Sequence, residues 1–268
     1  MIDIHNHIVW GIDDGSDDDI TSMEMAMIAS SSGITDIIAT PHCIPGRFEN
    51  YCGPEFDAAF ADLRDMLSKE KATSRLRIHR GMEVFACDKT PEDYDKGRIC
   101  CLAESDYMLI ECDFDEDPWF FRDVLMALKQ RGVRPIIAHP ERYYFAHDSI
   151  RYLFDLVNMG CALQLDSDSI SGEFGSTCRS VALELLSSSA AQLVASDAHD
   201  RSTRTPDMRS VADYVAQRFS YNYASLLFED NPRRIIENQK LLFRGQSANG
   251  GRTRPSSRYM SDEEYWGV

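Results

Sequence analysis

Histidines and carboxylates recur at the ends of short apolar runs in this sequence. Five of the seven histidines occupy such positions: His5, His7, His42, His139 and His199. Carboxylates stand beside them or at the remaining run ends: Asp13, Asp14, Glu83, Glu111 and Asp197. Burying so many of these groups together is costly unless cations pair with them. Imidazole and carboxylate donors without thiolates suit manganese, iron or zinc, so the pattern predicts a metal cluster. His79 and His147 have no partner motif, and we interpret them as ordinary surface or core histidines.

Apolar runs alternate with helical patterns, which indicates how the candidate ligands are positioned. Seven runs rich in β-branched residues are typical of buried parallel strands, at residues 2–5, 35–40, 76–84, 107–112, 134–139, 161–165 and 192–196. Helical patterns lie between or after them, at residues 20–32, 56–69, 119–131, 150–159, 177–188, 207–218 and 231–242. Gly33, Gly132 and Gly160 are expected to cap three of these helices.

This alternation predicts an α/β fold, a seven-stranded (β/α) barrel that is either complete or distorted. The carboxyl ends of barrel strands meet at one rim, so the candidate ligands are expected to converge there. An open doubly wound sheet is the alternative. No strand, however, is followed by the G-x-G-x-x-G of dinucleotide-binding folds or by a P-loop.

Composition and charge indicate where the protein acts and which classes of molecule it can bind. The 268 residues include 28 Lys and Arg against 44 Asp and Glu, a formal net charge of −16. Such a surface repels nucleic acid and anionic membranes, although bound cations would still let one cleft take a small phosphate. No run reaches the roughly 18 apolar residues of a membrane span, and the start has no signal-peptide pattern. We therefore expect a soluble cytoplasmic protein without membrane insertion. The residues predict no particular oligomeric state.

The eight cysteines form no C-x-x-C pair, so we expect reduced thiols that are buried or half-buried. None has an arginine six positions later, which excludes the C-x₅-R loop of cysteine-dependent phosphatases.

The character of the chain changes after Arg244. Residues 245–258 are rich in Gly, Ser, Asn and Arg, and residues 260–266 are acidic and aromatic. We expect one folded domain at residues 1–244 and a polar, flexible tail at residues 245–268.

Seven short motifs carry a resemblance to a known family. They are H-x-H at 5–7, Asp-Asp-Gly at 13–15, Thr-Pro-His at 40–42, Gly-Met-Glu at 81–83, Ile-Glu at 110–111, His-Pro-Glu-Arg at 139–142 and Ser-Asp-Ala-His at 196–199. The chain resembles the PHP (polymerase and histidinol phosphatase) superfamily. Within it, the chain is similar to the manganese-dependent bacterial protein-tyrosine phosphatases encoded with capsule and exopolysaccharide genes. The resemblance runs to about residue 242 and leaves the tail outside.

The resemblance implies a distorted seven-stranded barrel of the PHP type, with two or three metal ions at its carboxyl-terminal rim and Mn²⁺ favoured over iron or zinc. By position, the implied ligands are His5, His7, Asp14, His42, Glu83, Glu111, His139, Asp197 and His199. Spacing alone does not decide between Asp13 and Asp14, but Asp13 is the one expected to support a ligand. Arg142 and Arg204 match the family's phosphate-contacting arginines, and a salt bridge to a nearby carboxylate is the alternative for both. Asp166 stands where the family leads us to expect an amide, which adds a carboxylate beside the cleft.

The implied activity is hydrolysis of phosphotyrosine by a metal-bound hydroxide, with the ions and both arginines stabilising charge on the phosphate. The implied substrate is a phosphotyrosine protein, a bacterial tyrosine kinase that regulates capsular or exopolysaccharide synthesis. A small phosphomonoester such as histidinol phosphate is the alternative. A metal amidohydrolase also begins with H-x-H but is expected to close with one Asp rather than Asp-x-His. A regulatory scaffold is disfavoured by the complete ligand and arginine set.

Overall fold

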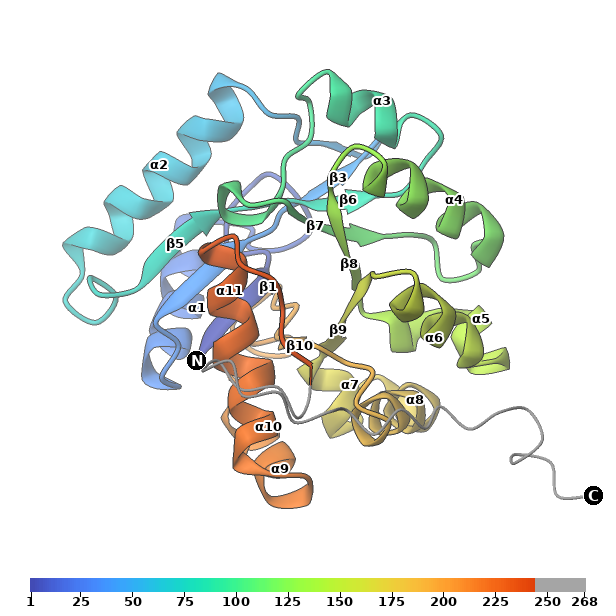
Figure 1. The fold of residues 1–268 in the computed structure, drawn as a ribbon. Helices are drawn as coiled ribbons and strands as arrows, with labels where there is room; N and C mark the ends of the chain where they lie inside the picture. The colour runs from blue at the N-terminus through green and yellow to red at the C-terminus, as the bar shows by residue number, and fades with distance from the viewer. Residues whose placement is uncertain (244–268) are drawn as a thin grey trace, which may run out of the picture.

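The computed structural model describes residues 1–243 and shows parallel strands curved into a barrel (Figure 1). Its strands are β1 (Ile2–Asn6), β2 (Asp36–Ala39), β3 (His42–Ile44), β4 (Phe48–Glu49), β5 (Arg77–Arg80), β6 (Glu83–Phe85), β7 (Tyr107–Glu111), β8 (Arg134–Ala138), β9 (Ala162–Asp166) and β10 (Leu193–Ala195). They form two sheets, in the orders β1-β2-β5 and β10-β9-β8-β7-β6-β3-β4. Every pairing is parallel except that of β3 with β4.

The two sheets close on each other between β10 and β1. Asp197 N donates to His5 O and His7 N donates to Ala198 O, each at 2.9 Å. Buried Asp3 reinforces this seam, because its carboxylate accepts from Ser196 Oγ at 2.6 Å and from Ser196 N at 3.0 Å. The first and last predicted strands are therefore neighbours, as a barrel requires.

The third predicted strand is two strands, β5 and β6, interrupted at Gly81 and Met82. A Cβ at Gly81 would lie 2.7 Å from Ile38 Cγ2 and 2.9 Å from Leu102 Cδ2, so only glycine fits this close approach. The break moves the chain from one sheet to the other and opens the barrel there. With it, the prediction of a distorted seven-stranded α/β barrel is confirmed. The β3–β4 hairpin was not predicted, because its strands have only three and two residues.

Helices cover the outside of the barrel and its amino-terminal end (Figure 1). They are α1 (Asp19–Ser31), α2 (Pro54–Lys69), α3 (Thr90–Asp95), α4 (Pro118–Lys129), α5 (Tyr144–Asp148), α6 (Arg151–Asn158), α7 (Ser167–Ser171), α8 (Gly175–Ser187), α9 (Arg209–Arg218), α10 (Tyr221–Ser225) and α11 (Asn231–Ile236). Two 3₁₀ turns, η1 (Leu102–Glu104) and η2 (Pro140–Arg142), and a π-helical turn, η3 (Leu226–Asp230), join them.

Local chemistry explains where these helices begin and end. Asp18 caps α1 by accepting a hydrogen bond from Thr21 N at 2.8 Å. The predicted glycine caps are confirmed, since Gly33, Gly132 and Gly160 have φ of 85°, 88° and 86°.

The predicted helix at 231–242 is wrong in length, because α11 ends at Ile236. Asn238 has φ 50°, and the chain then turns back so that Leu242 N donates to Asn231 Oδ1 at 2.7 Å. The predicted tail at 245–268 lies outside the described residues.

Apolar side chains fill the barrel beneath the rim. A buried cluster collects residues from strands around the ring and from α11: Ile2, Ile4, Ile38, Leu109, Ile136, Leu193 and Ile235. A larger cluster packs the outer faces of the strands against the helices. Polar side chains occupy the interior at the carboxyl-terminal end of the barrel. Within residues 1–243, no helix has the length and apolar character needed to cross a bilayer.

Candidate metal centre

The nine predicted ligands converge at the carboxyl-terminal rim of the barrel. They form three groups that share members: His7, Asp14, His42 and His199; His5, His7, Glu83 and Asp197; and His42, Glu83 and Glu111. Within each group, one candidate ligand atom per residue lies within 4.8 Å of the others. The ninth residue, His139, joins them through its Nε2, which is 2.9 Å from Glu83 Oε1. The parallel strands thus bring together side chains that are nearly 200 residues apart in the chain.

Hydrogen bonds on the far side of three imidazoles set which nitrogen faces the cluster. His5 Nδ1 bonds to Gln164 Oε1 at 2.9 Å, and His7 Nδ1 bonds to Asp13 Oδ2 at 2.8 Å. His199 Nδ1 bonds to the backbone oxygen of Asp197 at 2.9 Å. An acceptor at Nδ1 assigns the proton to that nitrogen, so each Nε2 presents its lone pair to the cluster.

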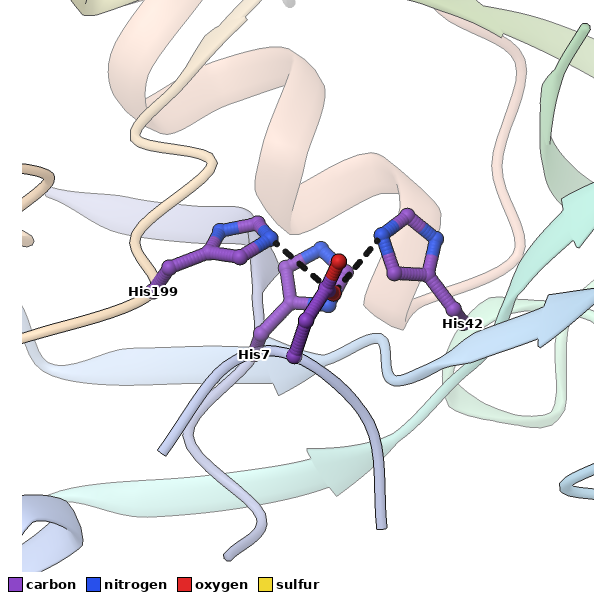
Figure 2. A group of neighbouring side chains, drawn as sticks. His7, His42 and His199 are labelled. Atoms are coloured by element: carbon purple, nitrogen blue, oxygen red, sulfur yellow. Dashed lines mark ion pairs between the residues drawn. The ribbon is translucent and has the colours of Figure 1, made fainter. Parts of the chain in front are cut away.

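His42 lies between two of the groups. Its Nε2 is 3.4 Å from Asp14 Oδ1, while its Nδ1 is 3.0 Å from Glu83 Oε2 and 2.8 Å from Glu111 Oε1. Figure 2 shows the rings of His7, His42 and His199 gathered together. His42 Nε2 and His199 Nε2 both form ion pairs with Asp14 Oδ1, at 3.4 Å and 3.7 Å. Asp14 is therefore placed as a member of the cluster. Asp13 instead holds His7 from behind, as the sequence led us to expect.

Carboxylates dominate the electrostatics of the rim. Burial alone would lower the pKa of His5, but Glu83 and Asp197 outweigh it and raise that pKa to about 9. Burial likewise opposes protonation of His42, yet the charge of Glu83 and the nearby Glu111 carboxylate raise its pKa to about 10. Burial instead lowers the pKa of His139 and lowers that of His199 to about 4. Protons at only some of the imidazoles therefore balance the excess of buried negative charge. Metal cations would meet the same demand.

Three buried polar atoms that make no hydrogen bond indicate whether the donor set fits metal ions. Among the described residues, His42 Nδ1, Glu83 Oε2 and Glu111 Oε1 are buried and make no hydrogen bond of acceptable geometry, although His42 Nδ1 lies 3.0 Å and 2.8 Å from the two oxygens. Buried polar atoms without partners are rare, because each costs about 1–3 kcal/mol. These three atoms belong to one of the candidate metal groups, and their nitrogen and oxygen donors suit Mn²⁺, iron or zinc. The residues present therefore fit the implied ions.

Two of the candidate ligands have strained backbones. His139 has φ 34° and Asp197 has φ 51°, the left-handed region that non-glycine residues rarely adopt. Such strain costs on the order of 1–3 kcal/mol and persists where the surrounding structure imposes it, often at functional sites.

Both predicted arginines reach the cluster through Asp197. Arg142 Nη1 is 3.1 Å from Asp197 Oδ2, and Arg204 Nη2 donates to the same oxygen. The other oxygen, Asp197 Oδ1, faces His5 at 3.3 Å and His7 at 3.4 Å. One carboxylate thus joins the arginines to the histidines. Arg204 Nε is buried without a hydrogen-bond acceptor, which leaves a donor available for an anion at the rim.

Asp166 is a second carboxylate in contact with Arg142. Its Oδ2 accepts from Arg142 Nη1 at 3.4 Å, and its Oδ1 accepts from Gln164 Nε2 at 3.0 Å. Burial raises the pKa of Asp166 well above its usual range; the charges of Asp197 and Glu141 add to this effect, and Arg142 opposes it. The carboxylate found where an amide was expected therefore supports Arg142 and is itself fully buried.

Sequence reasoning missed several residues of the site. Gln164 was passed over, although a lone amide within an apolar strand signals a buried hydrogen bond. Phe114 and Phe174 both contact the Arg142 guanidinium, with ring centroids 4.7 Å and 4.4 Å from its Cζ. No motif marks these loop aromatics. His79 and His147 lie outside the cluster, bonded to Asp36 Oδ1 and to the Glu141 backbone oxygen at 2.8 Å each.

Comparison with known proteins identifies the family. Residues 1–237 match the family described as capsular polysaccharide synthesis, CpsB/CapC, and the chain belongs to this family. The tyrosine-protein phosphatase YwqE of Bacillus subtilis (strain 168) is 33% identical over 249 residues, which cover 92% of this chain and 93% of YwqE.

Solved structures agree. A crystal structure from the work on YwqE of B. subtilis and CpsB of Streptococcus pneumoniae, described as unique metal-dependent tyrosine phosphatases, superimposes with a TM-score of 0.85 at 33% identity. The superposition covers 91% of this chain and 97% of the chain in that crystal structure. Histidinol phosphate phosphatase from Lactococcus lactis, at 13% identity and a TM-score of 0.53 over 85% of this chain and 94% of its own, shows a shared fold alone. The predicted enzyme class is confirmed: the chain is a metal-dependent tyrosine-protein phosphatase of the capsular polysaccharide synthesis type.

Proposed function

We propose that this enzyme dephosphorylates, in the cytoplasm, a bacterial tyrosine kinase that regulates capsular or exopolysaccharide synthesis. We propose further that His5, His7, Asp14, His42, Glu83, Glu111, His139, Asp197 and His199 hold two or three Mn²⁺ ions, and that Arg142 and Arg204 bind the phosphate. The observation that carries the proposal is the convergence of both arginines on Asp197 Oδ2, at the edge of the ligand cluster. A phosphate on the ions would lie within reach of both guanidinium groups.

The residues of the site have different proposed roles in catalysis. When bound, the ions would supply an acidified water and positive charge for the phosphate oxygens. Asp13 and Gln164 keep His7 and His5 turned towards the ions by accepting from their Nδ1 atoms. Arg142 and Arg204 offer planar, permanently charged donors that match two phosphate oxygens and stabilise the charge that develops on them.

The aromatic rings beside Arg142 favour an aryl phosphate. Phe114 is 38% exposed, and its ring centroid is 6.1 Å from that of His139. A phosphotyrosine ring packing on Phe114 would place its phosphate towards Arg142 and the ligands. The departing phenolate has a pKa of about 10, so it leaves with little help from an acid. We therefore assign no general acid to this site.

A panel of substrates tests the proposal. The Mn²⁺-loaded enzyme is assayed on phosphotyrosine peptides from the tyrosine kinase, on histidinol phosphate and on phosphoserine peptides of the same sequence. We expect kcat/KM for the phosphotyrosine peptides to exceed the other two by about tenfold or more, because only they carry the phosphate directly on an aromatic ring that could pack on Phe114. The purified phosphorylated kinase should also lose its phosphate. Faster hydrolysis of histidinol phosphate would replace the proposal with the small-molecule alternative.

A further inference from the structure

Two thiols and an arginine form a second group, with Cys52 just before α2, Arg80 at the end of β5 and Cys100 just before η1. Arg80 Nη2 donates to Cys52 Sγ at 3.2 Å, and the Cys100 thiol hydrogen-bonds to the Cys52 sulfur. Arg80 also contacts Cys100. The segments that carry them are close as well, since Cys52 N donates at 2.7 Å to the backbone oxygen of Arg98, two residues before Cys100. A thiol–thiol contact and a shared guanidinium therefore link two neighbouring segments of the chain.

The surroundings of Cys52 favour its thiolate. The hydrogen bond from Cys100 and the guanidinium of Arg80 outweigh burial and the charge of Asp57, and they lower the pKa of Cys52 to about 6. Cys52 also precedes the first residue of α2 by two positions, where the helix dipole stabilises negative charge. Neighbouring Cys101 is different, because burial raises its pKa to about 12. Cys52 is thus the nucleophilic partner and Cys100 the protonated one.

A small reagent has access to this group. Cys52 and Cys100 are both half-buried rather than enclosed. A hollow of about 220 Å³ lies beside Cys100 and the Arg80 that it shares with Cys52, lined by Arg80, Tyr94, Cys100, Cys101, Glu104 and Ser105. Ala103 and Glu104, just after the two adjacent cysteines, have φ of 49° and 60°, so this rim is a turn with strained backbone.

We propose that Cys52 and Cys100 form a peroxide-sensitive thiol pair, a modification site separate from the phosphatase centre. The Cys52 thiolate attacks one oxygen of hydrogen peroxide, the O–O bond breaks, and hydroxide leaves and takes a proton from solvent. The Cys100 sulfur then attacks the resulting Cys52 sulfenic acid, the S–O bond breaks, and the Cys100 proton leaves with the hydroxide as water. The two thiols lose two electrons, and the peroxide gains them. The product is a Cys52–Cys100 disulfide, which cellular thiols would reverse.

Peptide mapping of the full-length protein tests the pair. After brief treatment with hydrogen peroxide at pH 7, we expect a cross-linked peptide that joins Cys52 to Cys100. In Cys100→Ser, dimedone should label Cys52, since the sulfenic acid has no thiol to condense with. In Cys52→Ser, Cys100 should stay reduced. The matched control Cys161→Ser removes a buried, distant thiol and should leave the cross-link unchanged.

Alkylation rates of the untreated protein provide a second readout that needs no variant. The rate at Cys52 should rise less than about twofold between pH 7 and pH 9, whereas a thiol of ordinary pKa gains roughly 25-fold. Arg80→Gln should restore the steep dependence. A cross-link between other cysteines, or a steep pH profile at Cys52 in the unmodified chain, would overturn the proposal. Neither result depends on phosphatase activity, so failure here leaves the proposed function standing.

Discussion

At the scale of single residues, adjacent Asp13 and Asp14 have different tasks. Both Asp13 oxygens only accept, from His7 Nδ1 at 2.8 Å, His42 N at 2.9 Å and Gly15 N at 3.0 Å. Asp14 instead faces the Nε2 atoms of His42 and His199. Gly15 is required between this loop and the strand, because a Cβ there would lie 2.3 Å from His7 Cβ.

This division predicts different metal binding for two matched variants. Asp14→Asn should lower the bound metal by about one ion per chain, since it replaces a charged ligand. Asp13→Asn should keep the number of ions but weaken Mn²⁺ binding by about 10–100-fold, since it turns an acceptor into a donor behind His7. Elemental analysis and Mn²⁺ titration measure both quantities. Equal effects from the two substitutions would contradict the assignment.

The arginines give a second prediction at this scale. Arg142→Ala or Arg204→Ala should lower kcat/KM by about 10²–10³-fold, the usual cost of removing one preorganised donor to a developing charge. The metal content should not change. Arg142→Lys keeps the charge but loses the planar fork and the stacking on Phe174, so it should recover activity only in part. If metal is lost together with activity, the arginines act as salt-bridge supports of Asp197.

At the scale of elements, β2 and β5 are joined by a charged contact on the side of the barrel. Asp36, which is 2% exposed, binds Arg77 Nε at 2.6 Å and His79 Nε2 at 2.8 Å. Burial opposes ionisation of Asp36, but His79 and Arg77 outweigh it and hold the pKa of that carboxyl well below its usual range. The contact therefore stabilises the folded state above the unfolded pKa of about 4 and is lost as the pH falls through the lower folded value.

Asp36→Asn should lower the free energy of unfolding by about 1–2 kcal/mol at pH 7, a modest figure because Arg77 is largely exposed. The difference from the parent should shrink as the pH falls below about 4. Urea unfolding of both proteins across this range measures it. Asp65→Asn, which removes an exposed partner of Lys69, is the matched control and should change stability by less than about 0.5 kcal/mol. A difference that grows at low pH would contradict the account.

Elements also show what the sequence can and cannot predict. The barrel was predictable because most of its longer strands are continuous apolar runs, and the cluster of histidines and carboxylates was predictable because parallel strands end at one rim. Helices of five or six residues, such as α3 and α7, have too few turns to show a period. The early end of α11 depends on a distant hydrogen bond from Leu242 to Asn231. Phe114 and Phe174 lie in loops, and only tertiary contact brings them to Arg142.

At the scale of the whole molecule, the eight cysteines are free thiols, and we assign none of them to phosphate hydrolysis. Cys43 and Cys112 neighbour candidate ligands in the chain, yet burial raises the pKa of Cys43 to about 12 and also that of Cys112. Under reducing conditions, Cys→Ser at each of the eight positions should therefore leave activity within about threefold of the parent. Steady-state kinetics with Mn²⁺ present measures this. A loss of several orders of magnitude at one cysteine, in a folded and metal-loaded variant, would point to a thiolate nucleophile instead.

We propose that the nine-residue cluster binds the metal ions on which activity depends, and removing and restoring the metal tests this most directly. The protein is stripped with a chelator, assayed on a phosphotyrosine peptide, and then titrated with Mn²⁺ or Mg²⁺ while bound metal is counted. We predict no activity after stripping and recovery with Mn²⁺ once about two or more ions bind per chain, with Mg²⁺ much less effective because imidazole ligands suit it poorly. Full activity with less than one ion per chain would contradict the account.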